Sequence, residues 1–530
     1  MTTLPEEAAS GTSRRPLDVA VKRRLLLFGA LLSFSSIFQM GYSNAYPNTS
    51  IETFRVFMNE SVRGGVDDAK FTWIWSIVLN VWFIGFAIGS WIAVPVADRV
   101  GRKSCLLLGN SLNFGCAVLS LVSILTHLWW LFTLSRFLFA IAAALSMNSL
   151  ILLLQESAPP SMRGIMSFYA EMAFVLMNTL GCIAGMRTVF GNNLPLLVGL
   201  AALPTGVSVL ITPPFHESPR FLLLQRGDRA AAARALRFYQ CTDEEESEWM
   251  LDEVAKESAV SRTTDEFDSS LNEEVEEEKD EKKEQKEATS ISQLWTVPHL
   301  RKGLLLGVLS MQLTCSVWPV VYFSTELLRR ANVDVETAES MSSLMLIFSS
   351  VSTVLGMVVV ERVSRRRLFL LFSAGNLLAL LLFVLAACLQ PFFDHAKIGC
   401  IVALVLHGVT YSFALGPIAW FLTAELLPLS HRAAAQSIAL SCNQLAALAL
   451  SFLTLPLYDL FESFGASGAL TIFLFFVLPG AAALVLLVVH LPETRGVEIN
   501  EVIRQLQRSP RRVTAGDKNH LEMKTKTTMS

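Results

Sequence analysis

The stretch Asp98-Arg99-Val100-Gly101-Arg102-Lys103 is a charged turn between two long apolar segments. A closely similar stretch, Glu361-Arg362-Val363-Ser364-Arg365-Arg366-Arg367, returns in the second half of the chain. The 530 residues are 52% hydrophobic and 17% charged, whereas soluble proteins carry about 25% charged residues. A charged turn that recurs in so apolar a sequence indicates a membrane protein built from an internal repeat.

The apolar segments outside these turns are long enough to cross a bilayer. Each crossing helix needs roughly 20 apolar residues, because lipid cannot satisfy exposed backbone groups. Suitable stretches lie near residues 24–46, 71–96, 104–126, 128–154, 164–186, 191–213, 303–328, 338–360, 368–391, 398–423, 433–458 and 467–491. We therefore predict an all-α polytopic membrane protein, with twelve transmembrane helices forming two six-helix parallel repeats and with small cytoplasmic helices.

The same pattern divides the chain into five parts. They are a cytoplasmic N-terminal tail (1–23), a first six-helix bundle (24–213), a cytoplasmic linker (214–302), a second six-helix bundle (303–491) and a cytoplasmic C-terminal tail (492–530). The linker pattern predicts helices at 228–239 and 244–257. The following run, 262–290, is rich in Glu, Lys, Asp and Ser, and its lack of apolar residues predicts disorder.

Basic residues set the orientation, because they accumulate in cytoplasmic loops. They precede the first predicted span and follow the even-numbered ones, as at Arg99, Arg163 and Arg432. Both termini are therefore expected in the cytoplasm. Residues 47–70 would be extracellular, which makes Asn59 of the Asn59-Glu60-Ser61 sequon a candidate for glycosylation.

Other functional classes find little support in the sequence. The eight cysteines lie mostly in apolar runs without metal-like spacing. No phosphate-binding loop or nucleophile motif is found, and nothing suggests nucleic-acid binding. We therefore expect neither an enzyme nor a bound metal or cofactor.

Acidic and basic residues recur in matched order at the predicted cytoplasmic helix ends of each half. They are Asp98, Arg102, Glu156, Arg163, Glu217 and Arg220 in the first half, and Glu361, Arg365, Glu425, Arg432 and Glu493 in the second. Such groups can form a breakable cytoplasmic latch, as rocking one half against the other requires. The alternative is that they only solvate helix ends and set the topology.

These motifs, with Ser135-Arg136-Phe137, Glu217-Ser218-Pro219-Arg220-Phe221, Gly416-Pro417-Ile418-Ala419-Trp420-Phe421 and Pro492-Glu493-Thr494-Arg495-Gly496, resemble the sugar porter family of the major facilitator superfamily. Within that family, the chain is most similar to the animal facilitative hexose transporters. The resemblance covers residues 24–505. It implies a central hexose site and facilitated diffusion of glucose or fructose across the plasma membrane.

The resemblance also points to candidate substrate contacts. Asn443 and Trp420 match the family's sugar-binding asparagine and pocket tryptophan, and Gln312 falls at one of its paired glutamines. Trp318 or Val317, and Ser349, stand where the family usually has asparagines. Packing is the alternative for Trp420, and an interhelical hydrogen bond is the alternative for Gln312 and Asn443.

Glu171 falls where the family has a sugar-contacting glutamine. An ionisable residue within a membrane span is a functional candidate by default. It could bind sugar hydroxyls, couple transport to protons or pair with a neighbour. The first-span acid of proton-coupled members is replaced by Ser43 beside Asn44. Gly416 and Pro417 are a candidate hinge.

The altered pocket leaves two other functions open. One is transport of another small solute, such as a polyol or an organic anion, with proton coupling through Glu171. The other is a non-transporting nutrient receptor that signals through residues 214–302 or the C-terminal tail.

Overall fold

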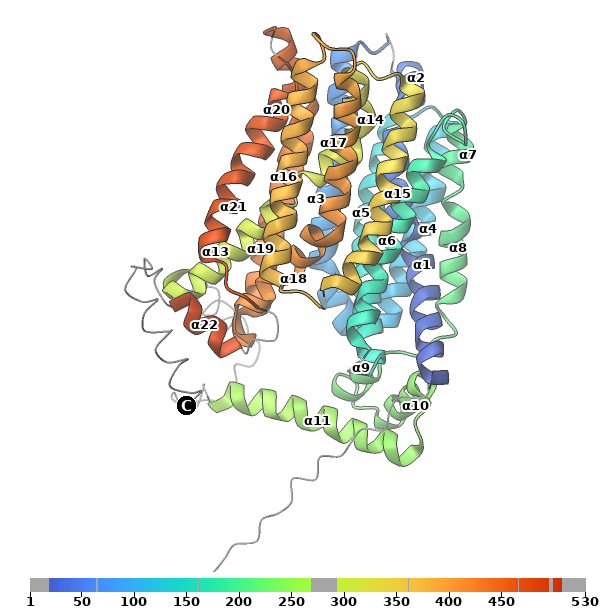
Figure 1. Cartoon of the computed structure of the whole chain (residues 1–530). Helices are drawn as coiled ribbons and strands as arrows, with labels where there is room; N and C mark the ends of the chain where they lie inside the picture. The colour runs from blue at the N-terminus through green and yellow to red at the C-terminus, as the bar shows by residue number, and fades with distance from the viewer. Residues whose placement is uncertain are drawn as a thin grey trace, which may run out of the picture.

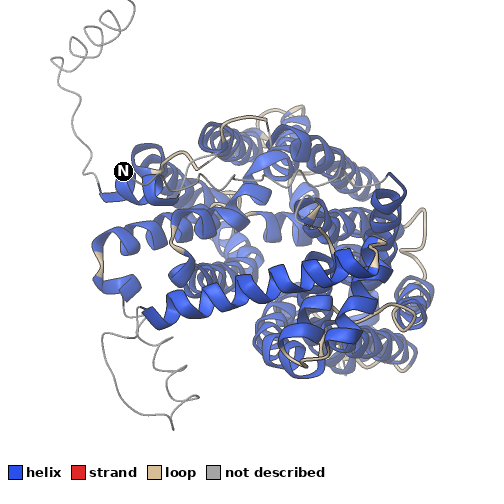
Figure 2. Ribbon diagram, turned by 90° about the horizontal axis from the view of Figure 1, so that it is seen from below, coloured by secondary structure: helices blue, strands red, loops and turns tan. Residues whose placement is uncertain are grey.

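The computed structural model describes residues 19–62, 65–159, 162–267, 293–360, 362–465, 467–494 and 499–507. These residues form helices and loops without a strand (Figure 2). The first half contains α1 (Val19–Thr49), α2 (Ile51–Ser61), α3 (Asp68–Val100), α4 (Arg102–Leu125), α5 (Trp129–Ser157), α6 (Arg163–Ala184), α7 (Leu194–Gly199) and α8 (Ala202–Ile211). The second contains α13 (Pro298–Gln312), α14 (Val317–Arg330), α15 (Val335–Val360), α16 (Arg365–Leu389), α17 (Ala396–Thr410), η1 (Tyr411–Leu415), α18 (Gly416–Leu426), α19 (Leu429–Ser463), α20 (Leu470–Ile472), η2 (Phe473–Val477) and α21 (Leu478–His490).

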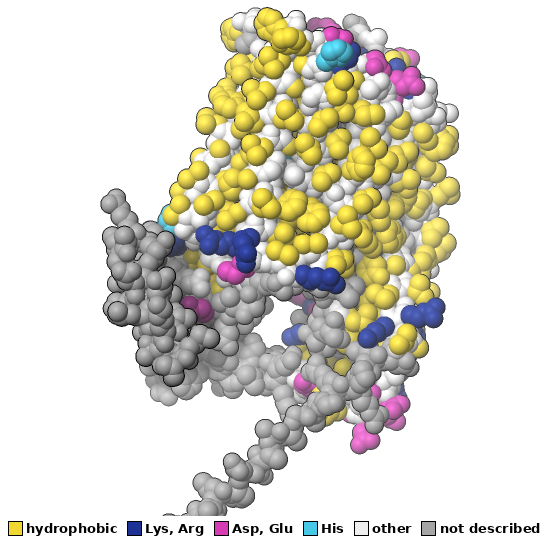
Figure 3. All heavy atoms as spheres, in the orientation of Figure 1, with side chains coloured by type: hydrophobic (Ala, Val, Ile, Leu, Met, Phe, Trp, Pro, Cys, Tyr) yellow, Lys and Arg dark blue, Asp and Glu magenta, His cyan; other side chains and the backbone are white. Residues whose placement is uncertain are grey.

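Eleven helical segments among the described residues are long and apolar enough to cross a membrane. The shorter apolar part of α6, Tyr169–Ala184, occupies the place of the fifth predicted span. Hydrophobic side chains cover the middle of the molecule in Figure 3, while Lys and Arg gather towards its lower end. The all-α polytopic fold is confirmed.

The helices between and after the two bundles lie together at one end of the molecule. They are α9 (Pro219–Leu224), α10 (Arg229–Gln240), α11 (Glu244–Phe267) and α22 (Ile499–Gln507), and we call this the linker end (Figure 1). We call the opposite end, which carries α2, the α2 end. Helix α11 runs beneath the bundle from α10 towards α22.

The structure corrects the sequence prediction in the linker. Helix α11 continues to Phe267, so residues 262–267 are helical and not disordered. Its first turn carries Glu244, Glu245 and Glu246, which are favourable at the positive end of a helix dipole. Residues 268–290 of the predicted disordered run lie outside the described part of the chain.

Several spans are interrupted rather than continuous. Helix α13 ends at Gln312, and α14 starts at Val317 after a turn. The π-helical segment η1 precedes Gly416-Pro417, and η2 precedes Leu478-Pro479. Proline lacks a backbone N–H and clashes with the preceding turn, so the local hydrogen-bond pattern widens there. These breaks expose backbone groups inside the membrane that side chains must satisfy.

Candidate functional site

Arg102 holds together the charged groups at the linker end of the first half. Its Nε lies 3.2 Å from a Glu156 carboxylate oxygen, and its Nη2 lies 3.2 Å from Asp98. The guanidinium also lies over the Phe221 ring, 5.0 Å from its centroid. Ser218 donates its hydroxyl to Glu156. This network joins α3, α4 and α5 to the start of α9.

Glu217 caps the start of α4 from outside the helix. Its carboxylate accepts the backbone N–H of Lys103 at 2.8 Å, which satisfies one of the free donors of the first turn. Gly101 makes this approach possible, because its φ is +106° and a Cβ there would lie 2.3 Å from Glu217 Oε2.

The second half repeats the arrangement. Arg365 forms an ion pair with Glu425, as Arg102 does with Glu156. Glu493 accepts the backbone N–H of Arg365 at 3.1 Å and the Ser364 hydroxyl, so it caps α16 as Glu217 caps α4. The internal repeat therefore extends to the contacts of single side chains.

Some residues of the predicted latch are not brought into these networks. Arg220 is exposed. The side chains of Arg163 and Arg432, and Glu361 as a whole, lie outside the described structure. The contacts described above for Glu156, Glu217, Glu425 and Glu493 all stay within their own half.

Polar contacts between the halves gather towards the α2 end. Arg187 Nε lies 3.0 Å from Glu339 Oε1, and the Glu339 side chain is only 3% exposed. Asn48 on α1 donates to the Ser324 hydroxyl on α14 at 2.8 Å. The hydroxyls of Thr179 and Ser350 lie 2.7 Å apart and join α6 to α15. The two halves are thus joined at the end that lies away from the charged networks.

Two of the candidate substrate residues converge on the break between α13 and α14. Asn443 is buried, and its Nδ2 donates to the Met311 carbonyl at 2.7 Å and to the Thr314 hydroxyl at 3.1 Å. The Cys315 thiol donates to Gln312 Oε1 at 3.2 Å. Asn443 therefore satisfies backbone that the helix break leaves open, which is the structural role foreseen as its alternative.

Tyr411 is a candidate site residue that sequence reasoning missed. Its hydroxyl hydrogen-bonds the Trp420 side chain, and it lies within electrostatic range of Glu171 and Cys315. Trp420 is 37% exposed, and Glu171 belongs to α6. The place of Tyr411 at the start of the π-helical segment before Gly416-Pro417 is the signal that could have found it.

The carboxylate of Glu171 is half-buried on the membrane-spanning part of α6. Among the described residues we find no hydrogen bond or ion pair to it. It lies within electrostatic range of Tyr411 of the other half.

Trp318 and Ser349 lie in other surroundings. Trp318 packs against Trp82 and Phe83 of the first half, with ring centroids 5.4 and 5.2 Å apart. Ser349 lies within the C-terminal bundle, where a Cβ on Gly408 would come 2.5 Å from its Oγ. They are therefore placed in an aromatic contact between halves and in a helix interface, respectively.

Arg136 is a buried cation in the first half. It donates to the carbonyls of Val78 at 3.0 Å and Ser43 at 2.8 Å, and to Asn44 Oδ1 at 3.4 Å. These partners are neutral oxygens. In the described structure no carboxylate pairs with Arg136.

The predicted glycosylation residue, Asn59, is exposed on α2, and its Oδ1 accepts the Val66 N–H at 3.0 Å. The described residues contain no group of three or more His, Cys, Asp or Glu side chains that could hold a metal ion.

Residues 28–506 match the family model described as "Sugar (and other) transporter". The chain belongs to this transporter family. Its relatives include the facilitated glucose transporter member 5 of solute carrier family 2 from Mus musculus, 27% identical over 90% of this chain and 91% of the relative. Member 7 from Mus musculus is 27% identical over 91% of this chain and 90% of the relative. Both relatives are named as transporters and not as enzymes.

Solved structures show the fold of the transporter. The partially occluded inward-open xylose transporter XylE from E. coli aligns with a TM-score of 0.66 at 16% identity, over 90% of this chain and 100% of that one. XylE bound to 6-bromo-6-deoxy-D-glucose, described as a major facilitator superfamily protein, gives 0.67 at 17% identity, over 91% and 98%. The transporter has the major facilitator fold, and its family carries sugars.

Proposed function

We propose that the transporter carries a hexose, glucose or fructose, down its gradient across the plasma membrane by alternating access. The linker end, with both termini, would face the cytoplasm. The observation that carries this proposal is where the two halves contact each other. Their polar contacts lie towards the α2 end, while the contacts described above for the charged networks at the linker end each join residues of one half. This is the arrangement of a carrier open to the inside.

The charged networks have a role in this cycle. Arg102, Glu156 and Glu217 would stiffen one half, and Arg365, Glu425 and Glu493 the other. Closing the linker end would bring the two networks together, with Arg163 and Arg432 as bridging cations. The proposal thus keeps the predicted latch but gives it a second function, the stiffening of each half while the latch is open.

The substrate would bind between Tyr411, Trp420 and Glu171, near Gln312 and Asn443. Tryptophan and tyrosine rings offer flat apolar faces to a sugar ring, and the amides and carboxylate offer hydrogen bonds to its hydroxyls. Asn443 also holds the break between α13 and α14 through its hydrogen bonds to Met311 and Thr314. A hydroxyl that competed for its amide would loosen the break, which links binding to movement of α13 against α14.

Proton coupling is the second candidate, because Glu171 lies in the membrane without an ion pair among the described residues. Against it stands Arg136, whose partners Ser43 and Asn44 are neutral. A buried cation that no carboxylate neutralises has no acid beside it to exchange protons. We therefore favour uniport.

The deciding experiment is uptake into proteoliposomes from a panel of labelled glucose, fructose, polyols and organic acids, with and without a pH gradient. We expect saturable hexose uptake that stops at equilibrium. A folded, inserted protein with no saturable hexose flux would refute the proposal.

The Glu171→Gln variant separates the two roles of Glu171. If the carboxylate only binds sugar hydroxyls, the variant should transport with an altered KM and no change in pH dependence. Accumulation driven by a proton gradient, lost in the variant, would establish coupling instead. Deleting residues 268–290 should leave uptake intact, and lost signalling without lost flux would favour a receptor role.

A further inference from the structure

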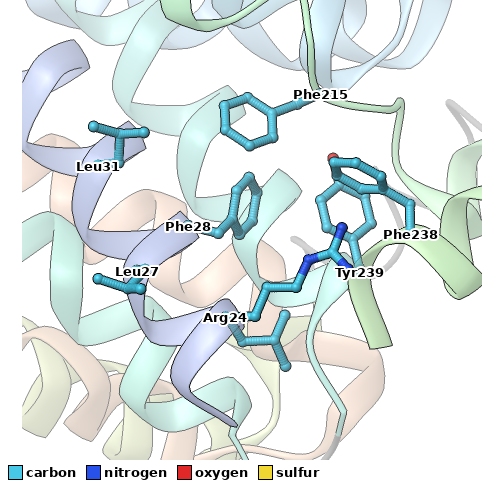
Figure 4. Close-up of a pocket in the computed structure, with 8 residues that line it drawn as sticks. Arg24, Leu27, Phe28, Leu31, Phe215, Phe238 and Tyr239 are labelled. Atoms are coloured by element: carbon cyan, nitrogen blue, oxygen red, sulfur yellow. The ribbon is translucent and has the colours of Figure 1, made fainter. Parts of the chain in front are cut away.

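A cavity of about 220 Å³ lies outside the transport path, at the linker end of the first half. Figure 4 shows it between Arg24, Leu27 and Leu31 on α1 and Phe238 on α10, with Phe28 and Phe215 between them. Apart from Arg24, these side chains are apolar.

The cavity opens towards lipid. Leu27 and Leu31 lie one turn apart on the membrane-spanning helix α1, and they are 69% and 49% exposed. Apolar side chains that project from such a helix lie in the hydrocarbon of the bilayer. The material in contact with this wall of the cavity is therefore an acyl chain.

The mouth of the cavity is cationic. Arg24 lies over the Phe238 ring at 4.8 Å and donates to Cys241 Sγ at 3.3 Å. Its neighbours Lys22 and Arg23 are exposed. Among the described residues Arg24 has no carboxylate partner, so its charge is left for a ligand to neutralise.

His216 also lies against Phe238. The His216 ring lies 4.5 Å from it, centroid to centroid. Burial, together with the nearby cations Lys103 and Arg234, holds the pKa of His216 below its usual range. Beside Arg24 on α1, the cations near this region are therefore Lys103 on α4 and Arg234 on α10, and the Glu217 carboxylate lies within electrostatic range of Tyr239.

We propose that this cavity binds one anionic phospholipid from the leaflet at the linker end. An acyl chain lies along Leu27, Phe28 and Leu31, and the phosphate pairs with Arg24. The bound lipid joins α1 to α10 and so fixes the linker to the first bundle. This site does not depend on which solute the transporter carries.

The test measures lipid binding to the purified full chain in detergent by native mass spectrometry, with phosphatidylglycerol and phosphatidylcholine of identical acyl chains. We expect preferential binding of phosphatidylglycerol, about fivefold weaker in Arg24→Ala and retained in Arg24→Lys. Arg301→Ala is the matched control, because Arg301 is an exposed arginine near the start of α13, the repeat counterpart of α1.

Leu31→Trp, which fills the cavity while keeping Arg24, should weaken the binding of phosphatidylglycerol, and each variant is checked for an unchanged melting temperature without lipid. Equal binding of the two lipids would overturn the proposal, as would equal losses in Arg24→Ala and Arg301→Ala. Full binding by Leu31→Trp would also overturn it. Competition by glycerol phosphate as strong as by the lipid would show an ion site and no seat for an acyl chain.

Discussion

The backbone conformation at position 101 and the close approach of Glu217 both require glycine there. Its φ of +106° strains any residue with a side chain, and a Cβ would meet Glu217 Oε2 at 2.3 Å. We expect Gly101→Ala to lower the free energy of unfolding by about 1–3 kcal/mol, measured by thermal or denaturant unfolding in detergent. Gly115→Ala is the control, since nothing lies within 4 Å of its Cβ position. Equal stability of the two variants would contradict this account of the turn.

The buried Arg136 has the neutral Asn44 among its hydrogen-bond partners. Asn44 Oδ1 already accepts from Arg136 at 3.4 Å, so Asn44→Asp would place a carboxylate beside a buried cation. Burial disfavours the charged form of such a carboxyl and the Arg136 cation favours it, and we expect uptake by this variant to depend on pH, unlike uptake by the native chain. Asn44→Ser, which removes the amide without adding charge, should stay independent of pH. A flat profile for Asn44→Asp would show that Arg136 has no influence on coupling.

At the scale of helices, an ion pair joins Glu339 on α15 to Arg187, which follows α6, at the α2 end. Glu339 is 3% exposed and Arg187 is 39% exposed, so Glu339→Gln leaves an arginine that can return to water. We expect it to destabilise the closed α2 end by about 1–2 kcal/mol. Labelling of cysteines introduced at the two ends measures the shift. The swapped pair Arg187→Glu with Glu339→Arg should restore the native pattern, and unchanged labelling in Glu339→Gln would exclude a gating role.

Helix patterns in the sequence predict most of this architecture, because spans of about 20 apolar residues and charged turns leave a strong signal. The break after Gln312 and the helix at Ile51–Ser61 have weaker signals. The break contains no glycine, and the first proline, Pro319, follows it. It depends on Asn443 from a distant helix to satisfy its backbone, and no local pattern reports such a partner.

The candidate site was predictable to a similar degree. Motif matches pointed to Trp420, Gln312 and Asn443, and these lie near the interrupted seventh and tenth spans. Tyr411 was missed because its importance follows from the π-helical turn that aims it at Trp420. Ser349 was chosen from its position in a motif, whereas the contact of its hydroxyl with Gly408 follows from helix packing.

For the whole molecule, the balance between its two open states is the property to test. Removing a latch residue should favour the state with an open linker end by about 1 kcal/mol, or roughly fivefold in population. We expect Glu425→Ala and Arg163→Ala to increase labelling at the linker end and decrease it at the α2 end. Arg367→Ala, an exposed arginine in the first turn of α16, is the control. Unchanged labelling in both test variants would refute the latch.

Two native cysteines allow the distance between the halves to be measured. All eight cysteines are free, and Cys241 and Cys442 are the exposed ones. Cys241 follows α10, which is fixed to α1 through Phe28 and Tyr239, whose rings lie 5.0 Å apart, whereas Cys442 belongs to α19 of the second half. With spin labels on these two cysteines, pulsed electron paramagnetic resonance would measure the distance between the halves in the unmutated chain. The proposed movement of one half against the other can therefore be tested in a protein that keeps all of its own residues.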